Sequence, residues 1–319
     1  MKGLIMLCHL LLVLSGVLFM PGAQAACSAS SSTTSFGSIN SFTVASTAQT
    51  VTSGSGFTCT GSLLSLASTN TVTATIASTS NASGSTPRLY SSSTGTYLPY
   101  SICSSSSCSS TYNVGSSFTW SETSLIGLLG LFNASDGSLP IYIRTSTGSN
   151  LPAGTYTDTI TLNWNYSICF VGVLGVCVYT TGTATSTVTV TLIVTNYCYI
   201  DSAPDVNFGT AALPGDFSSV NSSISVRCTR NAGYTVNLSS SNAISGDWRQ
   251  MSASLNGSTY YLQYQLARSG GTIWSNTNNY SNTGTGDSQS IPYTATVNAS
   301  QNTLPAGNYS DTVTVTVTY

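Results

Sequence analysis

The sequence predicts an all-β protein made of two antiparallel β-sandwich domains. Three observations indicate this fold: apolar residues that alternate with polar ones, turn-forming Gly, Asn, Ser and Pro at short intervals, and a unit that occurs twice. Strict alternation is typical of strands buried on one face. After residue 25, no stretch of the sequence combines helical periodicity with capping residues. An antiparallel sandwich in each copy is the simplest fold that fits.

The first 25 residues are expected to be a cleaved signal peptide. Lys2 supplies a positive charge, residues 4–20 form a predominantly apolar region, and residues 23–25 form an Ala-x-Ala cleavage site. The apolar run is short for a membrane anchor, and no later stretch reaches the ~18 apolar residues that a span needs. We therefore expect export through the periplasm and a mature chain that begins near Ala26.

The repeated unit is clearest at its end. LPAGTYTDTITLNWNY, at 151–166, returns as LPAGNYSDTVTVTVTY at 304–319, and YLPYSI, at 97–102, returns as YLQYQL at 261–266. Both terminal segments alternate strictly between apolar and polar residues, as half-buried strands do. The repeat divides the mature chain into a first domain, 26–195, and a second domain, 196–319.

The repeat also predicts the disulfides. The mature chain has eight cysteines, an even number that indicates disulfide bonds in an oxidising compartment. Each copy has one cysteine before a Phe-Gly pair and a second about 30 residues later. The equivalent pairs are Cys27–Cys59 in the first copy and Cys198–Cys228 in the second. The pairs found only in the first copy, predicted as local loop closures, are Cys103–Cys108 and Cys169–Cys177.

The two copies end differently. After Tyr166 the first continues through the loop at 169–177 into a further predicted strand, roughly 183–195, whereas the second stops at the equivalent Tyr319. We therefore expect the second domain to lack its last strand. Such a sandwich exposes an apolar groove between unpaired edges, which a strand from another chain can fill. The alternative is that the second domain pairs its own edges differently.

The charged residues exclude several functions. Without the signal peptide the chain has no Lys and no His, and six arginines face nine carboxylates, giving a net charge of −3. The lack of His excludes Ser-His-Asp and Cys-His nucleophiles and His-based metal sites. Scattered arginines do not form the basic face that nucleic acid requires. We expect no enzyme activity, no cofactor, no metal and no nucleic acid, with paired carboxylates only a formal possibility.

The first domain has apolar residues where the second has polar ones. The connection after Trp120 is apolar at its centre, the insertion CFVGVLGVC at 169–177 has no counterpart, and SLLSLAS at 62–68 is longer than its counterpart. Exposed apolar clusters mark interaction sites, although a buried core segment is the alternative for the first of them. The candidate surface-binding residues are Leu125, Ile126, Leu128, Leu129, Leu131, Phe132, Phe170, Val171, Val173, Leu174, Val176, Leu63, Leu64 and Leu66.

Two pairs of equivalent polar residues are expected to stabilise the fold. Asp158 and Asp311 occupy the same Tyr-x-Asp context in the two copies, which favours a structural role over catalysis. Tyr156 and Tyr309 are interpreted in the same way, as packing or corner residues.

LPAGNYSDTVTVTVTY, the Cys198–Cys228 spacing and the Phe208-Gly209 pair resemble the spore coat protein U domain family. The resemblance covers both copies, and therefore almost all of the mature chain. It implies immunoglobulin-like sandwiches, in which the N-terminal strand of a neighbour completes each pilus subunit. The implied partners are an adjacent pilin subunit that donates a strand, a periplasmic chaperone and an outer-membrane usher.

The resemblance also implies a place in the fibre. Cys27 is the second residue of the expected mature chain, which leaves no segment to donate, so the chain resembles the two-domain tip adhesin of archaic chaperone–usher (Csu-type) pili. The first domain would then attach bacteria to hydrophobic or abiotic surfaces and promote biofilm formation from the extracellular pilus tip. A loop stiffened by Cys169–Cys177 would lose less entropy on contact. The alternatives are a lectin-like, glycan-binding pilus tip and a non-adhesive structural pilus or coat subunit.

Overall fold

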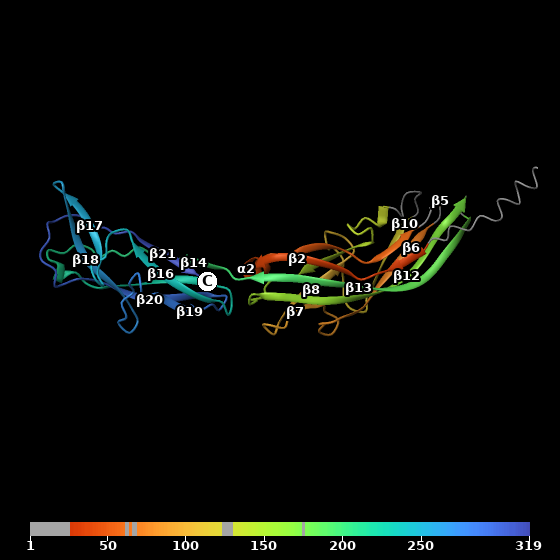
Figure 1. Cartoon of the computed structure of the whole chain (residues 1–319), viewed down its shortest axis with the longest axis horizontal. Helices are drawn as coiled ribbons and strands as arrows, with labels where there is room; N and C mark the ends of the chain where they lie inside the picture. Colours follow the sequence, from red (N-terminus) through yellow and green to blue (C-terminus); the bar gives the residue numbers. More distant parts are fainter. Residues whose placement is uncertain (1–25, 61–63, 66–68, 123–129, 174–175) are drawn as a thin grey trace, which may run out of the picture.

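The chain folds into two β-rich units that lie end to end (Figure 1). The computed structural model describes residues 26–60, 64–65, 69–122, 130–173 and 176–319. One hydrophobic core lies in the first unit, within Val44–Val194, and another lies in the second, within Cys198–Ala295. The predicted signal peptide lies outside the described residues.

One layer of the first unit contains the longest strands. Its strands, in order of pairing, are β10 (Ser117–Glu122), β6 (Asn70–Thr79), β12 (Gly154–Val173), β13 (Val176–Thr195) and β2 (Ser32–Asn40). β12 and β13 form one hairpin in which pairing continues from Gly154↔Val194 to Val173↔Val176. The insertion at 169–177 is therefore the end of this hairpin.

The facing layer is made of shorter strands. They are, in order of pairing, β7 (Arg88–Ser91), β8 (Thr96–Cys103), β11 (Pro140–Thr145) and β3 (Thr50–Gly54). The smaller elements of this unit are β1 (Ala26–Ala29), β4 (Phe57–Thr60), β5 (Leu64–Ser65), β9 (Thr111–Tyr112) and the helix α2 (Ser41–Ser46).

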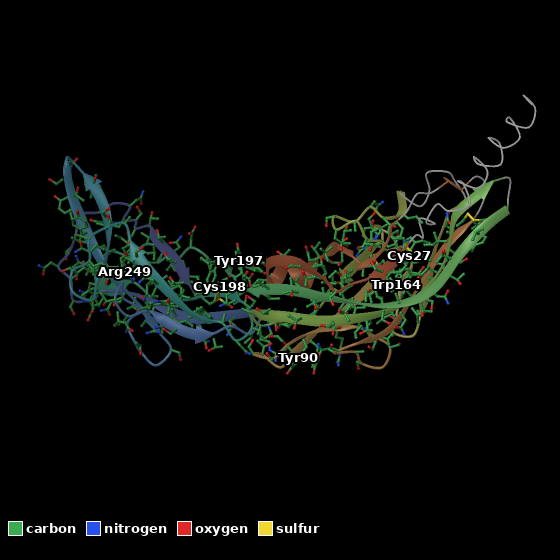
Figure 2. The ribbon with its side chains drawn as sticks, turned by 45° about the vertical axis from the view of Figure 1, so that its right-hand side comes forward. Cys27, Tyr90, Trp164, Tyr197, Cys198 and Arg249 are labelled. Carbon is green, nitrogen blue, oxygen red and sulfur yellow. A yellow bond between two sulfur atoms is a disulfide. The ribbon has the colours of Figure 1, made fainter. Side chains whose placement is uncertain are left out.

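Alternating residues of both layers form the first core. Ile160, Leu162 and Trp164 of β12 are fully buried, and Figure 2 shows where Trp164 lies in the first unit. Its ring stacks on that of Phe57 at 4.6 Å between centroids. The indole N–H of Trp164 donates to Ser186 Oγ at 2.8 Å, so its polar atom is satisfied inside the core. Burying each large apolar side chain contributes roughly 1.5–3 kcal/mol, which accounts for the strict alternation in these strands.

The first sandwich is not wholly antiparallel. β13 pairs with β2 in parallel, from Val188↔Ser32 to Thr195↔Asn40. Both strands run towards the junction between the units: β2 leads into α2, and β13 leads into the second unit. They therefore have the same direction where they meet, which the antiparallel prediction did not anticipate.

The second unit has a five-stranded and a three-stranded sheet. The larger contains, in order, β14 (Cys198–Ser202), β15 (Val220–Cys228), β20 (Ser288–Val297), β18 (Ser258–Arg268) and β17 (Arg249–Leu255). The smaller contains β19 (Tyr280–Thr283), β16 (Gly233–Ser240) and β21 (Val313–Thr318), and a short 3-10 helix, η1, spans Pro214–Asp216. Two sandwich units are thus present, as the sequence predicts.

Equivalent tyrosines hold equivalent corners in the two units. The hydroxyl of Tyr156 donates to the carbonyl of Pro152 at 2.9 Å, and that of Tyr309 donates to the carbonyl of Pro305 at 2.8 Å. Each bond reaches back four residues across the LPAG turn, as in the tyrosine corners of immunoglobulin-like sandwiches. The corner role predicted for these residues is confirmed.

The four disulfides have the predicted partners, two of them selected by the repeat and two expected as local loop closures. They are Cys27–Cys59, Cys103–Cys108, Cys169–Cys177 and Cys198–Cys228. The first and last are equivalent: each joins the first strand of its unit to the strand paired with it, through Cys27↔Cys59 and Cys198↔Cys228. The repeat selects these pairs because equivalent residues occupy equivalent places in the two units.

Candidate functional site

The three apolar segments of the first unit all begin or end near Asn70. β6 begins at Asn70, just after the segment at 62–68, and Glu122, the last residue of β10, pairs with Asn70. On the other side of β6, the backbone N–H of Cys169 donates to Asn70 Oδ1 at 2.7 Å. Strand register therefore brings the attachment points of the three segments to one end of the sandwich, which we call the distal pole.

Two of these segments also pair with each other. Leu64 and Ser65 of β5 align in parallel with Val171 and Gly172 of β12, near the end of the long hairpin. The Cys169–Cys177 disulfide links the two strands of the hairpin just before its end. In Figure 1 this end of the hairpin is the part of the described chain farthest from the second unit.

The hairpin projects beyond the sandwich. From Ser186 towards the junction every second residue of β13 is buried, whereas none of residues 177–185 is. Val178 is 75% exposed and its neighbour Tyr179 is 43% exposed, so side chains on both faces of the strand reach solvent. Sequence analysis missed these two residues because they follow the second cysteine of the insertion rather than lying between the two.

Leu131 and Phe132 differ from the expectation of exposed loop residues. Both are half-buried and pack against the first core, where the Phe132 ring stacks on Phe57 at 6.3 Å. They pack there because an aromatic cluster around Phe57 and Trp164 offers them a surface. At these two positions the alternative of a core segment describes the contacts better.

The remaining candidates lie wholly or partly outside the described residues. Those wholly outside are Leu63, Leu66, Leu125, Ile126, Leu128, Leu129 and Leu174. Those whose backbone alone is described are Leu64, Phe170, Val171, Val173 and Val176. Their contribution to binding stays a prediction.

The second unit has a groove of about 650 Å³ between its two sheets. One wall is formed by residues 307–315, which include the start of β21, and the other by residues 203–211. The apolar residues that also line it are Phe217, Ile224, Leu238, Met251, Leu262, Leu266 and Tyr293.

In the first unit, the place equivalent to this groove is filled by a strand, β13. β12 pairs with β6 on one edge and with β13 on the other, whereas β21 pairs with β16 alone among the described strands. Consequently Ile160 and Leu162 are fully buried, while their equivalents Val313 and Val315 are only half-buried. The groove is the slot that β13 occupies in the first unit.

The second wall of the groove, residues 203–211, also has an equivalent segment in the first unit, around Gly37. Gly37 and Gly209 have the same φ of 78°, and each N–H bonds a side chain two residues earlier, Ser35 Oγ at 3.0 Å and Asn207 Oδ1 at 2.8 Å. In the first unit this segment is β2, whose strand partner is β13. In the second unit residues 203–211 form no strand, because a strand requires a neighbour to bond.

Asp311 and Tyr264 line the groove, whereas their equivalents, Asp158 and Tyr100, are buried in the first unit. Tyr264 donates to Asp311 Oδ2 at 2.7 Å, and Tyr100 donates to Asp158 Oδ2 at 2.8 Å. Asp158 is 2% exposed, and this burial raises its pKa above the ordinary range. Burial, and then the Asp158 charge, raise the pKa of Tyr100. The hydrogen bonds agree with the structural role predicted for both aspartates.

The described residues hold no cluster of His, Cys, Asp or Glu suited to a metal ion. Nor does the described part of the chain contain a helix long and apolar enough to cross a membrane.

Comparison with solved structures finds a chaperone–usher pilus protein. A chain in the crystal structure of the CsuC-CsuE chaperone–tip adhesion subunit pre-assembly complex, from the archaic chaperone-usher Csu pili of Acinetobacter baumannii, is 27% identical. It superposes with a TM-score of 0.61, covering 93% of this chain and 100% of that one. The CupB6 tip adhesin from Pseudomonas aeruginosa is 13% identical with a TM-score of 0.33, over 92% and 93% of the two chains.

The sequence comparisons give the family. No curated protein matches the sequence. Residues 15–163 and 184–316 each match the Spore Coat Protein U domain, so the match covers most of both units. Together with the Csu similarity this supports a role as a pilus subunit or adhesin, a class whose members are not enzymes. The chain belongs to the Spore Coat Protein U domain family.

Proposed function

We propose that the chain is the tip adhesin of an archaic chaperone–usher pilus. The first unit, 26–195, attaches bacteria to hydrophobic or abiotic surfaces and promotes biofilm formation. The second unit, 196–319, takes a strand from the adjacent pilin, which anchors the adhesin to the fibre. The chain is exported through the periplasm, where a chaperone covers the groove, and an outer-membrane usher then passes it to the cell surface.

The observation that carries this proposal is that the attachment points of the three apolar segments lie together at the distal pole, around Asn70. Each fully buried apolar side chain contributes roughly 1.5–3 kcal/mol, so partial burial of several is sufficient for attachment. Many pili on one cell add avidity. The projecting hairpin, with Val178 and Tyr179 exposed, brings apolar surface forward of the sandwich.

Attachment of piliated cells to polystyrene tests the adhesive role. Replacement of Leu128, Leu129, Phe170 and Leu174 by Thr should abolish attachment, because it removes the apolar contact without adding charge. The control replaces Ile193 and Leu213 by Thr, since they are exposed apolar residues away from the distal pole. Attachment of the control should equal wild type at the same level of surface pili.

Three results would overturn the adhesive proposal. Normal attachment of the fourfold variant would exclude the apolar segments as the contact. Inhibition by one particular sugar, with no effect of the fourfold variant, would favour the lectin-like alternative instead. Loss of attachment in both variants would trace it to a surface property unrelated to the distal pole.

Display of the chain in pili on the cell surface tests whether a donated strand enters the groove. Val315→Asp places a carboxylate in the groove wall, where a buried charge is costly, and should prevent assembly into extracellular pili. Thr314→Asp is the matched control, because its side chain is exposed on the outer face of the same strand. Immunoblots of sheared pili give the result. Equal display of the two variants would show that no strand enters the groove.

A further inference from the structure

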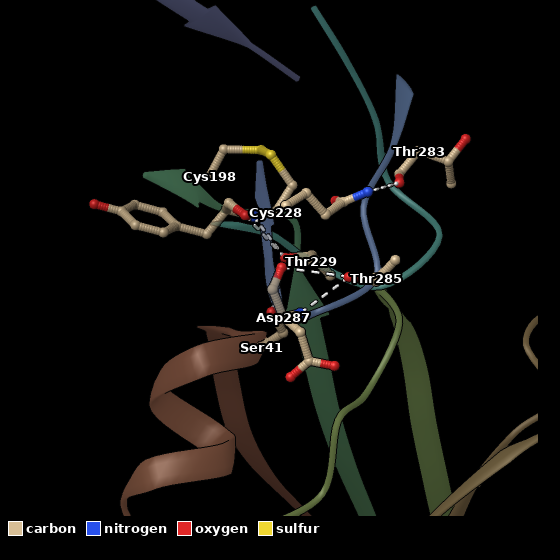
Figure 3. The surroundings of a disulfide bond; sticks show 9 residues. Ser41, Cys198, Cys228, Thr229, Thr283, Thr285 and Asp287 are labelled. Carbon is tan, nitrogen blue, oxygen red and sulfur yellow. Dashed lines mark hydrogen bonds between the residues drawn. A yellow bond between two sulfur atoms is a disulfide. The ribbon is translucent and has the colours of Figure 1, made fainter. Parts of the chain in front are cut away.

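The junction between the units is built around one buried hydroxyl. Thr229, the residue after β15, is fully buried and follows the Cys198–Cys228 disulfide (Figure 3). Its Oγ1 accepts a hydrogen bond from the backbone N–H of Tyr197 at 2.8 Å and donates to the carbonyl of Tyr197 at 3.1 Å. Tyr197, one of the two residues that connect β13 to β14, is thus held at both of its backbone polar groups.

The first unit reaches the same hydroxyl. Ser41, the first residue of α2, is 4% exposed, and its Oγ lies 2.7 Å from Thr229 Oγ1. With the Thr229 proton directed at Tyr197, Ser41 is the donor in this contact. One side chain therefore ties together the first unit, the connection and the second unit, and every one of its hydrogen-bonding positions is used.

A second contact lies on another element. The side-chain amide of Asn150, in the first unit, donates to the carbonyl of Thr285 at 2.8 Å. The Asn150 side chain occupies the space that a Cβ on Gly286 would need, and Gly286 has a φ of 84°. Glycine is required there both for its backbone conformation and for the approach of the first unit.

Aromatic rings close a third side of the junction. Phe42 of α2 meets Tyr197 edge-on at 6.5 Å and Tyr199 of β14 at 5.2 Å between centroids. Such pairs contribute about 0.5–1.5 kcal/mol beyond the area that they bury. The contacts of Ser41, Asn150 and Phe42 surround the connection, and a connection held on several sides does not act as a free hinge.

We propose that the junction is a rigid joint, centred on Thr229, through which pulling force on the second unit passes to the distal pole without a change in the angle between the units. The joint itself follows from the contacts alone, while its use under load rests on the proposed function. Where few contacts cross the boundary between two domains, a flexible joint is the usual expectation. The rigidity of this junction therefore depends on the contacts that the two units make across it.

Distances between spin labels test the joint in the full-length mature chain. Nitroxides attached through Thr183→Cys and Thr259→Cys, both exposed positions in different units, should give one narrow distance distribution by double electron–electron resonance. Thr229→Val keeps the shape but leaves the Tyr197 N–H without its acceptor, and should broaden the distribution. Thr229→Ser retains the hydroxyl and should stay narrow.

Asn150→Ala gives an independent result, because Asn150 is exposed and its loss does not threaten either core. It should also broaden the distribution. A broad distribution in wild type, or a narrow one in both Thr229→Val and Asn150→Ala, would overturn the rigid joint. None of these outcomes depends on what the distal pole binds. Detachment of piliated cells under shear, faster in Asn150→Ala than in wild type at equal static attachment, would connect the joint to load.

Discussion

At the scale of single residues, the two units use one polar arrangement in different surroundings. Asp158 and Asp311 accept hydrogen bonds from equivalent tyrosines, and the backbone N–H of Asn81 or Asn242 donates to the same carboxylate. Asp158 is buried in a strand that pairs with β13, whereas Asp311 lines an open groove. The same residues are therefore part of a core in one unit and part of a docking surface in the other.

Removal of the Asp158 carboxylate should destabilise the first unit. Asp158→Ala leaves the Tyr100 hydroxyl and the N–H groups of Asn81 and Thr159 without an acceptor in the core. A buried group without a partner costs about 1–3 kcal/mol, which applies in full to Tyr100, whereas Asn81 and Thr159 are half-buried and cost less, so we expect a total loss of about 2–4 kcal/mol. Asp158→Asn keeps an acceptor and should lose less. Equal unfolding free energies for the two variants in urea would contradict this.

Asp158 should also make stability depend on pH. Its pKa is raised in the folded chain above the ordinary value of 3.8, so the folded state binds the proton more tightly. This favourable contribution is complete below 3.8 and is lost as pH rises through the folded pKa. The unfolding free energy of wild type should therefore rise relative to Asp158→Asn on acidification from pH 7. A constant difference between the two proteins from pH 7 to pH 4 would exclude the linkage.

At the scale of elements, the sequence predicts strands better than it predicts their neighbours. Period-two alternation identifies β21 and most of β12 and β13, because one face of each is apolar. It does not reveal that 32–40 is a strand and 203–211 is not, since both contain the same Phe-Gly turn. The first segment is a strand that pairs with β13, and 203–211 has no such neighbour among the described strands.

The sequence also predicted only part of the candidate site: the apolar segments, but not where they lie relative to one another. Aligning the copies singles out the apolar segments, because the second copy shows what the fold itself requires at those positions. It does not predict their common origin at the distal pole, which depends on the pairing of Asn70 with Glu122 and on its contact with Cys169. Nor does it predict that Phe132 packs back onto Phe57.

The disulfides should differ in what they stabilise. Cys27–Cys59 closes a sequence separation of 32, while Cys169–Cys177 closes one of 8 at the end of the hairpin. Chain entropy then makes the first more stabilising by about 1 kcal/mol. Replacing both cysteines by Ala should lower Tm more for the first pair than for the second. Attachment to polystyrene should show the opposite order, and the same order in both assays would contradict the assignment.

At the scale of the whole molecule, the two functional regions lie at opposite ends of a fixed axis. The hairpin leads from the junction to the distal pole, and β21 runs towards the junction, where the Tyr319 ring lies 6.1 Å from that of Tyr197. A strand that fills the groove as β13 fills its own slot runs antiparallel to β21. It then leaves the groove beside Gly307, on the side away from the first unit. The fibre and the distal pole therefore point in opposite directions.

The direction of that strand can be read by cross-linking. In the first unit Thr161 pairs with Thr187 and Thr157 pairs with Thr191, and the repeat maps Thr161 to Thr314 and Thr157 to Ser310. A synthetic peptide of residues 184–196 serves as the strand, with a single cysteine at position 187 or 191. Thr314→Cys in the full-length chain should form a disulfide with the first peptide, and Ser310→Cys with the second.

Disulfides between the other two pairs of cysteines would contradict the antiparallel direction. If Thr314→Cys bonded the peptide with cysteine at 191, and Ser310→Cys the one with cysteine at 187, the strand would run parallel to β21. The donating subunit would then emerge beside α2, where Ser41, Phe42 and Asn150 already fill the junction. Because that space is occupied, the antiparallel direction is the one compatible with a rigid joint and a free distal pole.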